Sequence, residues 1–221
     1  MDHFQYRDGI LYAEDVAIPD IAAAVGTPFY CYSTATMTRH YQVLAGSLEG
    51  TGARICYAVK ANSNQAVIRT MVELGAGADV ISGGELQRAM AAGATADSIV
   101  FAGPGKTRDE LAQALAVDIY QFNVESEPEL RLLSAVASEM GKVAPGSIRV
   151  NPDVDAGTHE KITTGRKQNK FGIPIDRAMD IFDLGASLPG LAMLGVAIHI
   201  GSQITDLAPF EEAFDRALGL V

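Results

Sequence analysis

Chemically reactive side chains stand at the ends of several predicted strands, and Lys60 is the first of them. It closes an apolar run from residue 55 to 59, and a polar turn follows it. Because side chains alternate along a strand, we expect Cys56, Ala58 and Lys60 to share one face. An amine beside small residues can lose its proton and form a Schiff base with an aldehyde. The alternative is a lysine whose ammonium group reaches solvent from a strand end.

Four further candidates are Asp79, Glu85, Arg149 and His199. Three of them lie in predicted strands, and Glu85 lies at the start of the helix that follows the strand of Asp79. Each has a structural alternative. Asp79 could bond to a loop, Glu85 could favour a helix N-terminus, and Arg149 could pair with it. His199 could be a core histidine with its hydrogen bonds satisfied. Because parallel strands bring their carboxyl ends to one edge, the repeated placement favours a shared site.

The elements that must position these residues alternate between strand and helix from about residue 54 onward. We predict strands at 54–59, 78–81, 98–101, 119–124, 147–151 and 193–200. We predict helices at 64–74, 84–92, 108–115, 127–140 and 175–184, with another from about 209. This order indicates an α/β fold with a parallel sheet, either an open doubly wound sheet or a (β/α)8 barrel.

Glycine spacing favours the barrel over the open sheet. A dinucleotide-binding open sheet should carry GxGxxG directly after a strand. Here Gly75 and Gly77 precede a strand, and Gly103 and Gly105 lack the third glycine. We therefore predict a TIM-type barrel, incomplete here with about six of its eight strands.

A short N-terminal unit precedes the barrel. We assign residues 1–33 to it, with a strand at 9–12, a helical turn at 20–26 and a strand at 29–32. Ser33 or Thr34 is expected to cap a helix that runs to about residue 48. Residues 34–221 are assigned to the barrel.

Composition narrows the class of protein. The formal net charge of −10 and the sequence pI of about 4.8 disfavour binding to nucleic acid and to anionic membranes. No apolar run reaches the roughly 18 residues needed to span a bilayer, and the N-terminus lacks the features of a signal peptide. Cys31 and Cys56 stand in apolar surroundings without metal-ligand spacing. These features predict a cytoplasmic protein without a disulfide framework.

Several motifs resemble those of the group IV pyridoxal-phosphate decarboxylases, which pair an alanine-racemase-like barrel with a second, β-rich domain. One set surrounds the lysine and histidine, and another, from residue 149 to 173, is most similar to the members that act on diaminopimelate. The motifs are Tyr57-Ala58-Val59-Lys60-Ala61-Asn62, His199-Ile200-Gly201-Ser202-Gln203, the stretch from Arg149-Val150-Asn151-Pro152 to Gly157-Thr158-His159, Ile162-Thr163-Thr164-Gly165 and Lys170-Phe171-Gly172-Ile173.

The resemblance assigns cofactor contacts. It implies that Lys60 holds the aldehyde of pyridoxal 5'-phosphate and that His199 stacks on the cofactor ring. It further implies that Ser202 bonds the phosphate, helped by the backbone of Gly201. The cofactor ring is the electron sink for the carbanion that remains when carbon dioxide leaves.

The resemblance also implies roles for the charged residues. Asp79 and Glu85 match acidic positions near the cofactor-binding lysine, and Arg149 matches an arginine that orders this network. Such a cluster would tune proton transfer. The cations of the 152–174 connection could contact substrate carboxylates, face a partner subunit or belong to a solvated loop. They are Lys161, Arg166, Lys167 and Lys170.

The implied reaction is decarboxylation of meso-2,6-diaminopimelate to L-lysine, by a homodimer in the complete protein. One alternative is a related barrel decarboxylase for ornithine, arginine or carboxynorspermidine, and another is a non-catalytic cofactor-binding remnant. The family's later phosphate loop, partner for the pyridine nitrogen and second domain have no match after Ser202. We therefore expect this chain alone to be inactive and prone to aggregate.

Overall fold

A curved parallel sheet organises the computed structural model, which describes residues 2–154 and 171–220. Its strands lie in the order β10-β8-β7-β6-β5-β4, and every neighbouring pair is parallel. The short β9 (Ile173–Pro174) pairs with the carboxyl end of β8. The other strands are β4 (Cys56–Ala58), β5 (Gly77–Val80), β6 (Ile99–Phe101), β7 (Gln121–Val124), β8 (Ala144–Asn151) and β10 (Leu191–Ile198).

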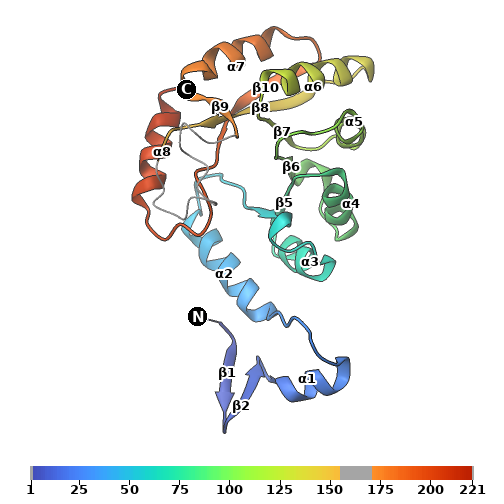
Figure 1. Ribbon diagram of the computed structural model, residues 1–221, viewed down its shortest axis with the longest axis vertical. Helices are drawn as coiled ribbons and strands as arrows, with labels where there is room; N and C mark the ends of the chain where they lie inside the picture. Colours follow the sequence, from blue (N-terminus) through green and yellow to red (C-terminus); the bar gives the residue numbers. More distant parts are fainter. Residues whose placement is uncertain (1, 155–170, 221) are drawn as a thin grey trace.

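Helices follow the strands along the outside of the arc, as Figure 1 shows for α3 to α7. Polar side chains start four of them: the side chains of Asn64, Ser82, Thr107 and Ser126 each accept a backbone N–H of the first turn. The helices are α3 (Gln65–Glu73), α4 (Gly83–Ala91), α5 (Arg108–Ala116), α6 (Glu127–Glu139), α7 (Ala178–Ser187) and α8 (Ala208–Leu218). Single 3-10 turns occur at η1 (Val59–Ala61), η2 (Ala96–Ser98) and η3 (Ile175–Arg177).

The main core lies between the sheet and these outer helices. Successive strand side chains point to opposite faces, and one set, including Val80, Phe101 and Phe122, is fully buried with Leu111 and Leu130 of the helices. Each such side chain contributes ~1.5–3 kcal/mol by leaving water. The alternate positions therefore face the inner side of the arc.

The N-terminal unit differs from its prediction in its strands: the structure adds strands at 4–7 and 16–17 and lacks the one predicted at 29–32. An antiparallel sheet of β1 (Phe4–Arg7), β2 (Ile10–Ala13) and β3 (Val16–Ala17) leads into α1 (Ile18–Val25). The predicted strand at 29–32 is wrong, since this segment is irregular in the structure. Its aromatic residues have strand propensity, but propensity forms a strand only where a neighbouring strand is available for pairing. Tyr30 and Tyr32 instead stack on each other with their rings largely exposed.

Helix α2 (Thr34–Ser47) joins this unit to the barrel strands, and its predicted cap is confirmed. The Ser33 hydroxyl accepts the backbone N–H of Thr36 at 3.0 Å. Glu14, in the turn between β2 and β3, accepts the Ser33 hydroxyl at 2.7 Å and the backbone N–H of Ala35 at 2.9 Å. These hydrogen bonds lower the pKa of Glu14, so its carboxylate ties the hairpin to the start of α2.

Strand β10 carries a bulge. Met193 pairs with Gly146 and Gly195 pairs with Ser147, so Leu194 is an extra residue in the ladder. The extra residue determines which face of the sheet each later side chain of β10 points to. The strand ends at Ile198, earlier than predicted, and His199 follows its end.

Candidate functional site

A cavity of about 260 Å³ opens at the carboxyl ends of the strands. Four of the predicted residues line it: Lys60, Asp79, Arg149 and His199. They lie on, or within two residues after, four different strands, which supports the expectation that the fold converges them. The rest of the lining is Ile81, Ala102, Gly103, Pro104, Asn123, Phe171, Ala197 and Ile198.

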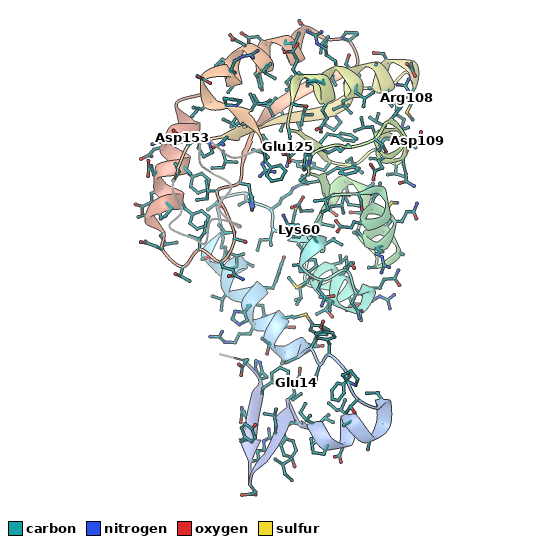
Figure 2. All side chains as sticks on the ribbon, in the orientation of Figure 1. Glu14, Lys60, Arg108, Asp109, Glu125 and Asp153 are labelled. Carbon is teal, nitrogen blue, oxygen red and sulfur yellow. The ribbon has the colours of Figure 1, made fainter. Side chains whose placement is uncertain are left out.

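Lys60 does not lie on a strand, which corrects the sequence argument. Strand β4 ends at Ala58, and Lys60 is the middle residue of the 3-10 turn η1. The turn buries Val59 and leaves Lys60 exposed. The shared face with Cys56 and Ala58 is therefore wrong, yet the turn still brings the amine to the cavity. Figure 2 places Lys60 near the middle of the molecule.

Asp79 is a half-buried carboxyl group on the inner face of β5. Burial raises its pKa to about 6, opposed by the Lys60 charge and reinforced by the Glu85 charge. Among the described residues, none donates a hydrogen bond to its buried Oδ1. An unmatched buried oxygen costs free energy, so this atom is suited to a polar group that enters the cavity.

Glu85 stands beside the cavity rather than in its lining. Its Oε2 accepts the backbone N–H of Ile81 at 2.8 Å, and Ile81 does line the cavity. The backbone N–H of Glu85 also donates to the Ser82 hydroxyl at 3.2 Å. The structure therefore shows the helix-start role that the sequence left open, together with an electrostatic effect on Asp79.

Arg149 is held by Glu125, a residue that the sequence analysis missed. The guanidinium Nη1 donates to Glu125 Oε1 at 2.6 Å; the Glu125 side chain is buried and that of Arg149 is 13% exposed. Because Val124 pairs with Ile148 in the parallel ladder, the next residues of the two strands are neighbours. The Arg149 guanidinium also lies 5.7 Å from the centre of the Phe171 ring. The predicted pairing of Arg149 with Glu85 is not among the ion pairs of the described residues.

His199 combines partial burial with two nearby cations. Burial, together with the charges of Arg149 and Lys60, lowers its pKa to about 4. Its imidazole is therefore neutral near pH 7. A neutral aromatic ring on a cavity wall can lie against another ring without adding a positive charge.

Two of the proposed cofactor contacts lie outside the lining. Gly201 has φ 144°, a backbone conformation that favours glycine, and Ser202 is exposed. Lys161, Arg166, Lys167 and Lys170, with the motifs at 156–159 and 162–165, lie outside the described residues.

The chain matches the family model described as pyridoxal-dependent decarboxylase, pyridoxal binding domain, over residues 17–221. The chain belongs to this family. Members of the pyridoxal-dependent decarboxylase family use pyridoxal as cofactor, in agreement with the aldehyde-binding lysine that the sequence indicates.

Curated relatives in the family carry the name diaminopimelate decarboxylase. The chain is 54% identical to that of Pseudomonas fluorescens over all of this chain and 53% of the relative, and 52% identical to that of Vibrio cholerae with the same coverage. The chain spans about half the length of the curated relatives it matches.

Solved structures in the family have the same fold. Diaminopimelate decarboxylase from M. jannaschii, in co-complex with L-lysine, superposes with a TM-score of 0.90 at 36% identity, and the match covers 100% of this chain and 52% of that one. The Helicobacter pylori enzyme, also complexed with L-lysine, gives 0.87 at 38% identity over 91% of this chain and 51% of that one. The predicted barrel class, present here as six parallel strands, is confirmed.

Proposed function

We propose that this chain holds pyridoxal phosphate through Lys60 and forms the cofactor-binding part of an enzyme that converts meso-2,6-diaminopimelate to L-lysine and carbon dioxide. The observation that carries the proposal is the cavity that joins Lys60, Asp79, Arg149 and His199. The names of the relatives and the L-lysine in two related structures support the substrate.

The residues around the cavity fit the cofactor. Its volume of about 260 Å³ is close to the lower end of the ~300–1,000 Å³ usual for small-molecule sites. Lys60 supplies an exposed amine for an aldehyde, and the buried Asp79 Oδ1 is without a hydrogen bond from the described residues. When bound, pyridoxal phosphate supplies a ring that accepts the electron pair left by departing carbon dioxide.

His199 would support the ring from its face. Its low pKa keeps the imidazole neutral at the pH of most cells, so stacking adds no charge to the two cations nearby. The histidine follows β10 directly, so the end of that strand sets its place on the cavity wall.

The charged residues would supply a proton-transfer group to the site. Lys60 and Arg149 lie close enough to Asp79 to lower the pKa of its carboxyl group, against the stronger effect of burial. With a pKa of about 6, Asp79 is mostly ionised at pH 7 and can take up a proton in the cavity. Arg149 is held beside this site by its ion pair with Glu125.

Gly201 and Ser202 are proposed to bind the cofactor phosphate. The exposed Ser202 hydroxyl is free to turn toward an anion, and the positive φ of Gly201 orients the backbone beside it.

The homodimer, the cytoplasmic location and the division at residue 33 also remain predictions. Among the described residues, no helix is long and apolar enough to cross a membrane.

Borohydride reduction tests the cofactor contact. The protein as its gene encodes it is incubated with pyridoxal phosphate, reduced and mapped by peptide mass spectrometry. We expect the added mass on Lys60 and its disappearance in Lys60→Ala, with Lys142→Ala as a control that retains it. Modification of another lysine while Lys60 stays unmodified would refute the assignment.

Substrate choice is tested by specificity constants for meso-diaminopimelate, ornithine and arginine in the same protein. We expect carbon dioxide and L-lysine to form from diaminopimelate with the highest kcat/KM. Comparable values for ornithine would favour the related decarboxylases, and cofactor binding without turnover of any of the three would favour the non-catalytic alternative.

A further inference from the structure

Lys106 is a buried lysine beside the cavity that the proposed chemistry does not use. Its side chain is 1% exposed, and its ammonium lies 5.5 Å from the centre of the Phe101 ring. Nζ donates three short hydrogen bonds: to Glu129 Oε1 at 2.6 Å, to Gly103 O at 2.7 Å and to Asn123 O at 2.7 Å. All three ammonium protons therefore have acceptors.

Two of these acceptors belong to the cavity wall. Gly103 and Asn123 both line the cavity, one from the loop after β6 and the other from β7. Lys106 thus links two separate parts of the wall through their backbone carbonyls. The loop also lies close to β5, since a Cβ on Gly103 would come within 3.1 Å of the Ile81 side chain.

Stability alone is a poor explanation for this lysine. Removing two charges from water offsets most of the attraction within a buried ion pair, so such pairs contribute little net stability. Three hydrogen bonds of fixed geometry do, however, define the positions of the groups they join. The same ion pair leaves Glu129, whose pKa is raised by burial, with a compensating charge.

We propose that Lys106 is a positioning residue that fixes the spacing of Gly103 and Asn123, and thereby the shape of the wall against which pyridoxal phosphate binds. This inference rests on the proposed function of the cavity. Lys106 itself need not touch the cofactor, because it acts through the two backbone segments.

The chain provides a matched control in Lys142. Its ammonium also donates to two backbone carbonyls and one carboxylate: Leu115 O at 2.7 Å, Ala116 O at 3.3 Å and Asp118 Oδ1 at 2.7 Å. This lysine ties the end of α5 to the segment before β8 and is absent from the cavity lining. Its side chain is more exposed, at 28%.

The experiment measures thermal stability and pyridoxal-phosphate affinity in four proteins made as the gene encodes them. They are the unchanged protein, Lys106→Met, the double variant Lys106→Met/Glu129→Met, and Lys142→Met. Lys106→Met leaves Glu129 buried without its counter-ion, so we expect the Tm to fall by about 6–20 °C. The double variant removes both charges and should recover most of that loss.

Cofactor affinity distinguishes positioning from stabilisation. We expect Lys106→Met and the double variant to bind pyridoxal phosphate about 10- to 100-fold more weakly, because both lose the hydrogen bonds to Gly103 and Asn123. The absorbance band of the bound cofactor should also shift in both variants. Lys142→Met should bind like the unchanged protein.

Recovery of affinity together with Tm in the double variant would overturn the positioning role, as would equal losses of affinity in Lys106→Met and Lys142→Met. Failure of the unchanged protein to bind pyridoxal phosphate would overturn the proposed function and this inference with it.

Discussion

At the carboxyl end of the sheet, a cavity of about 260 Å³ is lined by charged groups held in place by buried partners, whereas the amino end has a larger hollow of about 800 Å³. The larger hollow is lined mainly by small or solvent-reaching residues, and Arg54 lies against the Tyr120 ring at 4.6 Å. Burial raises the pKa of the Cys56 thiol there, which keeps it protonated and unreactive.

Fixed charge, rather than volume, distinguishes the two ends. At the carboxyl end, Arg149 and Glu125 form a buried ion pair, while at the amino end Lys142 pairs with an Asp118 side chain that is 78% exposed. Water already screens the Lys142–Asp118 pair, and it solvates the remaining charge if one partner is removed. The first pair cannot be broken without leaving a charge inside the protein.

The largest expected effect therefore comes from breaking the buried pair. Glu125→Ala leaves the Arg149 guanidinium without its counter-ion, and we expect unfolding in urea to show a loss of about 3–5 kcal/mol. Glu125→Gln keeps an acceptor for the guanidinium and should lose less. A change below about 1 kcal/mol for Glu125→Ala would mean that the two ends of the sheet do not differ in this way.

The second prediction concerns Asp79 and pH. Its pKa is raised from 3.8 to about 6 in the folded protein, so ionisation opposes folding increasingly as the pH rises through this range. Asp79→Asn removes that penalty, and we expect a gain in unfolding free energy on the order of 1–3 kcal/mol at pH 7.5 without cofactor.

The pH profile provides the internal control for Asp79→Asn. The gain should shrink as the pH falls from 6 to 4, because the carboxyl group is then protonated in the folded state and increasingly protonated in the unfolded state. A gain that is the same at pH 4 and pH 7.5 would show that charge burial is not its source. By the proton-transfer role proposed for Asp79, the same variant should also lower turnover.

The smallest effect is expected at the amino end. Asp118→Asn removes the charge that faces Lys142 and still tolerates the backbone φ of 57° at this position. We expect a change of about 0–1 kcal/mol, which decreases further as salt is added. A loss of unfolding free energy as large as that of Glu125→Ala would show that ion pairs at the two ends of the sheet contribute equally.

The fold was accessible from sequence because helix and strand alternate with clear periods. The strand ends were less certain: β10 stops at Ile198, and Lys60 lies in a 3-10 turn. The strand expected at 29–32 failed because propensity cannot supply a pairing partner.

Part of the candidate site could also have been predicted from the sequence. Glu125 directly follows a predicted strand, so the rule that selected Lys60 would have selected it too. Lys106 and Glu129 gave no such signal, because their contact joins a loop to a helix through tertiary packing alone.

The bulge at Leu194 has a consequence for how relatives of different length should be aligned. Met193 contacts Gly185 of α7 on the outer side, whereas His199, an even number of residues later, lines the inner cavity. In a regular strand the two would share a face; the inserted residue reverses the alternation between them. A relative that lacks this residue would still pair Met193 with Gly146 and Gly195 with Ser147, and so present the same two faces. Loss of Leu194 alone would therefore leave Met193 and His199 on the faces that they occupy here, and a gap in an alignment of this strand belongs at Leu194.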